Sequence, residues 1–211
     1  MILPRVYPIL DTELLARRSS SLSDAAAAFL DAGAGILQIR HKGHWSRDIF
    51  AEAELVARLA REAGATLIIN DRADIAMLLD AGLHIGQDDL SPRAARRLIG
   101  PDAVLGFSTH NAAQLAAAGG EPVTYLAFGP VFQTASKQNA DPVTGLDELR
   151  RCRALVEQPL AAIGGITLEN AADVLAAGAD SVAVISALLP ERSTSVSLRE
   201  RMEEWLKATA P

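Results

Sequence analysis

"DAAAAFLDAGAGILQIR", residues 24–40, holds an alanine-rich helical pattern, two glycines and a short aliphatic run, in that order. The helical part ends in Ala-Gly, which fits a glycine just past the C-terminus of a helix. The run Ile36–Arg40 has the length and composition of a buried strand. The stretch therefore predicts a helix that leads directly into a strand, which is the repeating unit of an α/β fold.

The same unit recurs along the chain of 211 residues. Other helical patterns are "DIFAEAELVARLAREAG", "ADIAMLLDAG" and "LENAADVLAAG", and the last helix is predicted over Leu198–Ala208, after the connection "SALLPERSTSVS". The predicted strands are Val6–Leu10, Ile36–Arg40, Thr66–Asn70, Leu83–Gly86, Val104–Phe107, Tyr125–Phe128, Leu160–Ile163 and Ser181–Ile185.

Strand–helix units at a spacing of about 26 residues predict one (β/α)8 barrel, the TIM-barrel fold, as a single domain over residues 1–211. An open doubly wound sheet is the main alternative, because it is built from the same units. Two observations favour the barrel. No predicted strand is followed by a G-x-G-x-x-G turn, and no linker or change of composition divides the sequence.

Composition limits the partners that we expect. The net charge is −6 and no run of five or six like charges occurs, so a nucleic-acid partner is not expected. No apolar run reaches the ~18 residues that span a bilayer, and the N-terminus lacks a signal-peptide pattern, so we expect a cytoplasmic protein without a membrane partner. Cys152 is the only cysteine, which excludes an internal disulfide, and we expect its thiol to pack in a core.

Barrel enzymes place their chemistry at the C-terminal ends of the strands, and one such end carries three polar residues. Gln38, Arg40 and Lys42 alternate along the second predicted strand and beyond it, so their side chains should project to the same side, into the barrel mouth. Arg offers a planar fork and Lys a point charge, and both suit phosphate oxygens. The alternative for this trio is a solvated strand end or a structural ion pair.

Two carboxylates follow the next strands. Asp71 comes directly after the third strand and Asp89 shortly after the fourth, so both should reach the same rim. Mg²⁺ commonly takes one or two carboxylates and fills its other positions with water and substrate phosphates. A basic set beside an acidic pair therefore predicts a metal–diphosphate site. The alternative for "IINDR" is a helix N-cap, since Asn and Asp are favoured there.

Glycines and histidines mark the remaining strand ends. "IGGI" and "VIS", residues 163–166 and 184–186, follow the seventh and eighth strands, where barrels commonly bind phosphate through backbone N–H groups. They indicate a second phosphate site, although tight turns also need glycine. For His84 we expect a structural hydrogen-bonding role. His110 is a candidate acid or base, with a structural role equally open.

With these motifs in order, the chain resembles the thiamine-phosphate synthase family over nearly its full length. The motifs that carry the resemblance are "QIRHK", "INDRADIA", "HIGQDDL", "GFSTHN", "FGPVFQTASK", "AIGGI" and "AGADSVAVIS". The resemblance implies a (β/α)8 barrel transferase. It would condense 4-amino-2-methyl-5-(diphosphooxymethyl)pyrimidine with 4-methyl-5-(2-phosphooxyethyl)thiazole, with Mg²⁺ as cofactor, and release thiamine phosphate and pyrophosphate.

The resemblance also implies roles for individual residues. Asp71 and Asp89 would hold Mg²⁺, and the match of Asp89 to the family makes Asp88 the weaker candidate. Lys137, Ser108 and Arg40 would act in catalysis. The pyrimidine diphosphate would be bound by Gln38, Arg40, Lys42, Asn70, Ser108 and Lys137, and the thiazole phosphate by Thr134, Ser136, Gly165, Ile185 and Ser186.

Two departures from the family pattern occur. Ser136 stands where the family usually has Thr, and serine keeps the hydroxyl group. The segment between Asp71 and Asp89 is one residue shorter than usual, which affects the placement of Asp89.

Two other functions stay open at this level. A thiazole tautomerase, a paralogous barrel, would use His110 as an acid–base group and would not need the complete diphosphate set. A non-catalytic phosphate-binding barrel would hold thiazole phosphate without releasing pyrophosphate. All three functions imply small-molecule partners, and the sequence leaves a homo-oligomer open.

Overall fold

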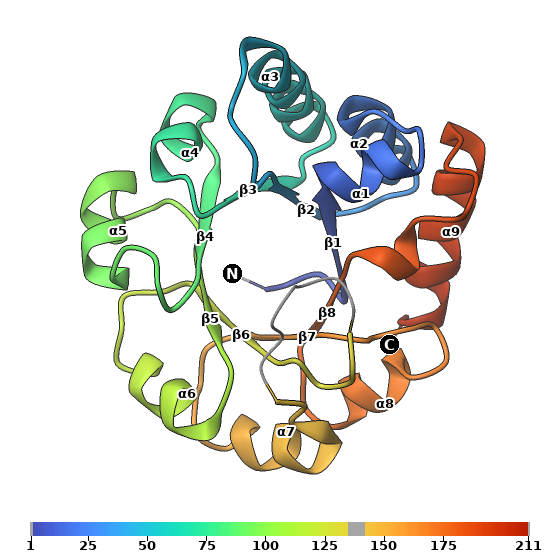
Figure 1. Cartoon of the computed structure of the whole chain (residues 1–211). Coiled ribbons are helices and arrows are strands. Elements are labelled where there is room, and N and C mark those ends of the chain that lie inside the picture. The colour runs from blue at the N-terminus through green and yellow to red at the C-terminus, as the bar shows by residue number, and fades with distance from the viewer. Residues whose placement is uncertain (1, 135–141, 211) are drawn as a thin grey trace.

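The computed structural model describes residues 2–134 and 142–210. Its parallel strands form a closed barrel in chain order, and the circle closes where Val6 pairs with Val182. Figure 1 views this ring along its axis, with the helices around the outside. The strands are β1 (Val6–Asp11), β2 (Ile36–Arg40), β3 (Thr66–Asn70), β4 (Gly82–Ile85), β5 (Leu105–Thr109), β6 (Tyr125–Phe128), β7 (Leu160–Ile163) and β8 (Ser181–Val184). The predicted (β/α)8 barrel is confirmed.

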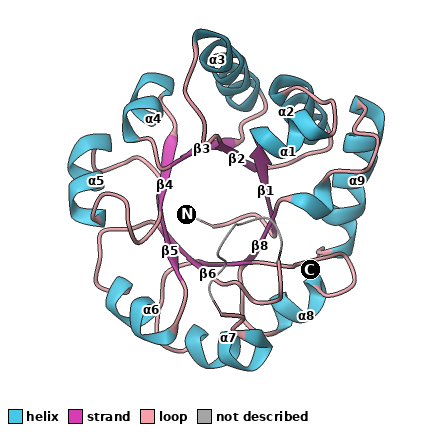
Figure 2. Ribbon diagram, viewed as in Figure 1, coloured by secondary structure: helices cyan, strands magenta, loops and turns pink. Residues whose placement is uncertain are grey.

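Helices cover the outer face of the strands on all sides, as Figure 2 shows by colour. A single turn of 3-10 helix, η1 (Ser186–Leu188), follows β8. The helices are α1 (Thr12–Arg17), α2 (Leu22–Asp31), α3 (Arg47–Glu62), α4 (Ala73–Leu79), α5 (Pro92–Ile99), α6 (Ala112–Ala118), α7 (Gly145–Arg153), α8 (Ala171–Ala176) and α9 (Ser195–Ala208). Among the described residues, no helix is both long and apolar enough to cross a membrane.

Alternation along the strands divides the buried side chains into two cores. Leu10, Leu37 and Ile39 face outward into the large core beneath the helices. Tyr7 and Ile36 face inward to a smaller core inside the barrel. Leu3 also belongs to the inner core and is 4% exposed, and Figure 1 shows the N-terminal segment crossing the centre of the ring. The N-terminal segment thus packs Leu3 into the barrel at the end opposite the carboxyl ends of the strands.

Several predicted boundaries were wrong by a few residues. β5 continues to Thr109 because Ser108 pairs with Ala127, so Ser108 lies in the strand and not after it. β8 ends at Val184, which places Ile185 and Ser186 beyond the strand. α9 begins at Ser195 because Thr194 forms a capping box with Ser197.

The predicted end of the helical pattern "ADIAMLLDAG" also differs from the structure. Gly82 does not follow the helix as a terminating glycine but opens β4. Asp80 takes the left-handed conformation at the end of α4, with φ 52°. A Cβ at Gly82 would lie 2.8 Å from the Val104 carbonyl oxygen, a backbone atom, so glycine is required here by the close approach of the neighbouring chain.

Candidate active site

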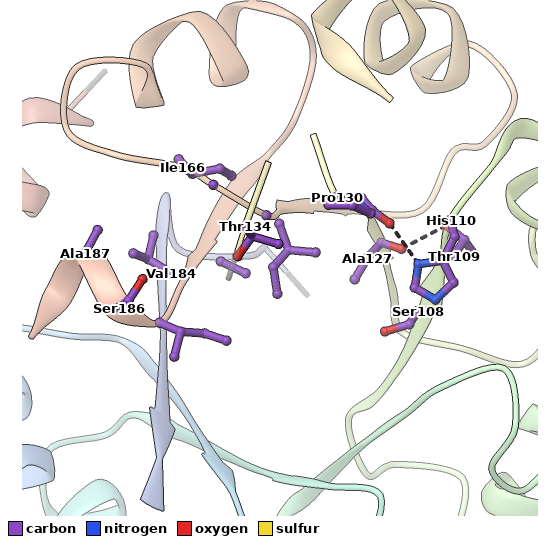
Figure 3. Close-up of a pocket in the computed structure, with 16 residues that line it drawn as sticks. Ser108, Thr109, His110, Ala127, Pro130, Thr134, Ile166, Val184, Ser186 and Ala187 are labelled. Atoms are coloured by element: carbon purple, nitrogen blue, oxygen red, sulfur yellow. Dashed lines mark hydrogen bonds between the residues drawn. The ribbon is translucent and has the colours of Figure 1, made fainter. Parts of the chain in front are cut away.

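Two cavities open at the carboxyl ends of the strands. The polar cavity has a volume of about 420 Å³ and lies over β2 to β5; its walls include Arg40, Lys42, Asn70, Asp71, Asp88, Asp89, Ser108 and His110. The glycine cavity is narrower, about 60 Å³, and lies over β5 to β8; its walls include Ser108, His110, Thr134, Gly164, Gly165, Ile185 and Ser186. Ser108 and His110 line both cavities, and Figure 3 places them across the glycine cavity from Ser186.

Both cations of the polar cavity are paired with carboxylates. Arg40 donates to Asp11 Oδ2, and these two side chains are only 17% and 11% exposed. Asp11 also caps α1, because its Oδ1 accepts from the backbone N–H of Leu14 at 3.0 Å. Lys42 is 56% exposed and pairs with Asp71. Two members of the strand-end trio, Arg40 and Lys42, thus form ion pairs with carboxylates outside the trio. The same two cations line the polar cavity.

Asp71 has an unusual backbone and an unusual acidity. Its φ is 62°, in the left-handed region, and its N–H donates to the His84 carbonyl at 2.8 Å. Burial raises the pKa of Asp71 above its ordinary value; Lys42 opposes this shift and the neighbouring Asp89 carboxylate adds to it. Strained backbone conformations of this kind concentrate at functional sites. Asp71 and Asp89 line the same cavity and lie close enough for one carboxylate to affect the other, as the sequence predicted.

The N-cap alternative for Asn70 and Asp71 is wrong. The cap position of α4 is Arg72, and no side chain among the described residues caps this helix. Asn70 ends β3 and is 8% exposed, and its Nδ2 is buried without a hydrogen-bond partner in the described part of the chain. A buried amide donor without a partner is costly, so this one is suited to a ligand in the cavity that it lines.

Gln38 lies deeper than the other two members of the trio. It is 2% exposed, and its Nε2 donates to the Tyr7 hydroxyl at 2.8 Å. It lines a small space that also touches Arg40, Ser108 and Ile185 and so connects the two larger cavities. Gln38 therefore faces the floor of the site, whereas Arg40 and Lys42 face the polar cavity.

The two histidines of the site differ in their surroundings. His84 is 7% exposed, and its ring nitrogens are hydrogen-bonded to Tyr125 and Ser108, both at 2.8 Å, so the predicted hydrogen bonding of this side chain is confirmed. His110 lies at the wall between the cavities, and its Nδ1 donates to the Gly129 carbonyl at 2.8 Å (Figure 3). Because Nδ1 holds the proton, Nε2 of a neutral His110 is left as an acceptor.

The glycine cavity is walled by glycines and apolar side chains. Gly165 has φ 62°, and a Cβ there would lie 2.4 Å from the Gln133 carbonyl oxygen. Glycine is therefore needed because the loop after β6 passes directly over the loop after β7. Thr134 and Ser186 supply hydroxyl groups to the same walls. Ser136 and Lys137, which the resemblance assigns to the two substrates, lie outside the described residues.

Sequence reasoning missed three buried residues of the site. Asp11 ends β1 and pairs with Arg40, and its position directly after a predicted strand was the available signal. Tyr7 and Tyr125 point into the barrel and join their hydroxyl groups at 2.7 Å. Their inward direction follows from strand alternation, but their contact depends on barrel closure, which no local pattern encodes.

Comparison with known proteins identifies the family. A family model described as thiamine monophosphate synthase matches residues 6–188. The chain is 46% identical over 208 residues to thiamine-phosphate synthase of Koribacter versatilis (strain Ellin345), and the match covers 97% of this chain and 95% of that protein. The chain belongs to the thiamine monophosphate synthase family.

Further comparisons agree with membership of the thiamine monophosphate synthase family. Thiamine-phosphate synthase of Roseiflexus sp. (strain RS-1) is 42% identical over 194 residues, which are 90% of this chain and 81% of that protein. The solved structure of thiamine phosphate pyrophosphorylase from Pyrococcus furiosus superposes with a TM-score of 0.84 at 29% identity, over 98% of this chain and 96% of that one. The chain is therefore an enzyme, a transferase of thiamine biosynthesis.

Proposed function

We propose that the chain condenses 4-amino-2-methyl-5-(diphosphooxymethyl)pyrimidine with 4-methyl-5-(2-phosphooxyethyl)thiazole and releases thiamine phosphate and pyrophosphate. The observation that carries this proposal is the composition of the polar cavity. Two cations, Arg40 and Lys42, share its walls with the carboxylates Asp71 and Asp89 and with the buried, unpartnered amide of Asn70. A diphosphate that carries a divalent cation satisfies all of these groups at once.

The donor set fits Mg²⁺. In the described part of the chain, no group of three or more His, Cys, Asp or Glu side chains could hold a metal ion. Mg²⁺ needs fewer protein ligands, because it keeps several waters and takes substrate phosphates. Asp71 and Asp89 would hold it, and it would neutralise part of the diphosphate charge. The raised pKa of Asp71, caused by burial and by the adjacent Asp89, supports this role, since a cation there relieves both causes.

The two substrates would occupy the two cavities. We assign the pyrimidine diphosphate to the polar cavity, with Arg40, Lys42, Asn70 and Ser108 at its phosphates and Gln38 on the floor beneath it. We assign the thiazole phosphate to the glycine cavity, where Thr134, Gly165, Ile185 and Ser186 form the walls. Ser108 stands at the junction, so the reacting atoms would meet above it. Ser136 and Lys137 stay part of the proposal through the family resemblance alone.

The mechanism that suits this site is a dissociative substitution. The bond from the pyrimidine methylene to the diphosphate breaks first, the ring amine stabilises the resulting cation, and the thiazole nitrogen then attacks it. No protein nucleophile is required. Arg40, Lys42 and Ser108 stabilise the departing anion, while the cavity walls hold the two substrates in line. Loss of one such contact is expected to lower the rate by roughly 10²–10³-fold, as for removal of an oxyanion-hole donor.

One assay tests the proposal directly. The purified protein is incubated with both substrates, with and without Mg²⁺, and pyrophosphate and thiamine phosphate are measured. We expect both products in equal amounts, and only when Mg²⁺ is present. A folded protein that formed neither product would contradict the proposal.

The same assay separates the alternatives. A tautomerase that used His110 would isomerise a thiazole carboxylate phosphate and release no pyrophosphate. A non-catalytic barrel would bind thiazole phosphate and leave it unchanged. The complete cation and carboxylate set of the polar cavity favours the synthase, because neither alternative has a use for it.

A further inference from the structure

A chain of five hydrogen-bonded side chains crosses the interior of the barrel. Gln38 Nε2 lies 2.8 Å from the Tyr7 hydroxyl, and the two tyrosine hydroxyls are 2.7 Å apart. The Tyr125 hydroxyl lies 2.8 Å from His84 Nδ1, and His84 Nε2 lies 2.8 Å from Ser108 Oγ. We name this chain, Gln38–Tyr7–Tyr125–His84–Ser108, the tyrosine relay. It begins at the floor of the site and ends at the residue that lines every cavity described above.

The chemistry of these groups gives the relay a direction. The amide NH2 of Gln38 can only donate, so the Tyr7 oxygen accepts from it. The buried Tyr7 proton also needs an acceptor, and among the described residues only the Tyr125 oxygen is bonded to this hydroxyl besides Gln38, so Tyr7 donates to Tyr125. Tyr125 then donates to His84 Nδ1. A neutral imidazole that accepts at Nδ1 carries its proton on Nε2, so His84 donates to Ser108 Oγ. Burial raises the pKa of both tyrosines, which keeps both hydroxyls protonated as this direction requires.

The last member of the relay is thereby set as a donor. Because Ser108 Oγ accepts from His84, its own proton points away from the imidazole and toward the cavities. A Ser–His pair at hydrogen-bond distance usually suggests a nucleophile and its base. Here Nε2 already holds a proton, so His84 cannot remove the proton of Ser108.

The barrel makes room for this contact at one position. His84, Gly106 and Tyr125 are register partners across β4, β5 and β6. A Cβ at Gly106 would lie 2.1 Å from Tyr125 Cζ and 2.4 Å from His84 Nδ1. The two rings meet over the glycine, with centroids 5.6 Å apart and planes 25° from parallel. Because Gly106 of the middle strand, β5, has no side chain, His84 on β4 and Tyr125 on β6 can form a hydrogen bond across it.

We propose that Tyr125 is a positioning residue that acts through His84 to hold the Ser108 hydroxyl as a hydrogen-bond donor toward the anionic leaving group. The catalytic consequence rests on the proposed function, whereas the direction of the relay does not. Because negative charge on the leaving group grows in the transition state, a fixed donor lowers the barrier more than it improves substrate binding.

The direction of the relay is tested by ¹⁵N NMR of the histidine rings at about pH 8, where imidazole is neutral. In the unaltered protein we expect His84 to be fully in the Nε2–H form. Tyr125→Phe keeps the ring but removes the donor to Nδ1, so we expect the Nδ1–H form to appear. Tyr7→Phe is the matched control, because it leaves Tyr125 bonded to His84 and should leave the tautomer unchanged. An Nδ1–H ring in the unaltered protein would overturn the proposal.

Steady-state kinetics test the consequence. We expect Tyr125→Phe to lower kcat for pyrophosphate release roughly three- to tenfold, the range for one hydrogen bond, with KM changed less than about twofold. In a Ser108→Ala background the same substitution should have no further effect on kcat, because the relay acts only through that hydroxyl. Equal effects in both backgrounds would show a merely structural role and overturn the proposal.

The two proposals fail in different ways. If the unaltered protein releases no pyrophosphate but His84 is in the Nε2–H form, the proposed function is wrong and the direction of the relay stands. If the enzyme is active and Tyr125→Phe changes neither the tautomer nor kcat, the relay has no positioning role. Thermal midpoints of the variants identify any loss of folding, and the tautomer of the unaltered protein needs no variant at all.

Discussion

The polar cavity and the glycine cavity lie on opposite sides of Ser108 and use different parts of the chain. The two cations that line the polar cavity are already paired with carboxylates, Arg40 with Asp11 and Lys42 with Asp71. The glycine cavity is lined mainly by glycines and apolar side chains, with hydroxyl-bearing side chains at Ser108, Thr109, Thr134 and Ser186. In the polar cavity, single charged side chains can be neutralised by substitution. In the glycine cavity, a substitution at a glycine adds atoms and changes the shape of the wall.

This difference predicts two kinds of sensitivity. In the polar cavity, a neutralised side chain should affect the chemical step, because the proposed function places the developing charge of the leaving group there. In the glycine cavity, an added Cβ should affect the binding of one substrate, because the wall loses its shape and not its charge. We therefore expect variants in the polar cavity to change mainly kcat and variants in the glycine cavity to change mainly KM.

The largest effect is expected at Asp71. We expect Asp71→Asn to lower Mg²⁺-dependent pyrophosphate release by about 10³-fold, because one of the two metal carboxylates is lost. Asn tolerates the left-handed backbone at φ 62°, so the fold should be kept. Asp88→Asn is the matched control, since Asp88 lines the same cavity and is not an assigned ligand. Near-normal turnover of Asp71→Asn would remove the metal assignment.

A smaller effect is expected at Gly165. We expect Gly165→Ala to raise KM for the thiazole phosphate roughly tenfold with KM for the pyrimidine diphosphate unchanged, because its Cβ would meet the Gln133 carbonyl at 2.4 Å. Gly64→Ala is the control: Gly64 has φ 66° but nothing within 4 Å of an added Cβ. Gly64→Ala should lose about 1 kcal/mol of stability to backbone strain, Gly165→Ala should lose more because of the added clash, and only Gly165→Ala should change KM.

The affinity for Mg²⁺ should depend on pH. Burial, together with Asp89, raises the pKa of Asp71, so the proton leaves this carboxyl at a pH above the ordinary value of roughly 3.9. As pH falls toward the raised pKa, protons compete with the metal, and below it the apparent affinity should fall about tenfold per pH unit. Calorimetric Mg²⁺ titrations across this range measure the effect. A constant affinity between pH 4 and 8 would contradict it.

The smallest effect is expected at Cys152, which lies in α7, away from both cavities. Its side chain is fully buried, and burial raises the pKa of the thiol to about 11, with Glu148 adding to the shift. Little reactive thiolate is therefore present near neutral pH. We expect iodoacetamide to leave both the thiol and turnover unchanged until denaturant unfolds the chain. Rapid labelling of the native enzyme would show that this helix opens locally.

Local patterns predicted most of the fold and much of the site. Strand alternation placed Arg40 and Lys42 toward the mouth, and the strand-end rule brought Asp71 and Asp89 to the same cavity. Both predictions succeed because each depends on one strand at a time. The boundary of β5 was missed because its last residues, Ser108 and Thr109, are polar and stay in the strand through pairing with β6.

Contacts that need the closed barrel could not be read from the sequence. Tyr7 and Tyr125 are 118 positions apart, and their hydroxyls meet because β1 and β6, which are separated by β7 and β8 in the closed ring, both point a tyrosine into the interior. In the sequence, Gly106 has no feature that distinguishes it from other strand glycines. Its role depends on the strand register, which places it between His84 and Tyr125. Such information is distributed over three strands, so no window of sequence contains it.

The ion pair between Lys42 and Asp71 would couple the two binding events of the proposed function. Because the two side chains are paired, a diphosphate would have to draw Lys42 away from Asp71, and Mg²⁺ would have to draw Asp71 away from Lys42. Whichever ligand binds first releases the partner that the second one needs. Thermodynamic linkage requires the two to strengthen each other by the same factor. The salt bridge between Lys42 and Asp71 would thus favour simultaneous occupation by metal and diphosphate over occupation by either one alone.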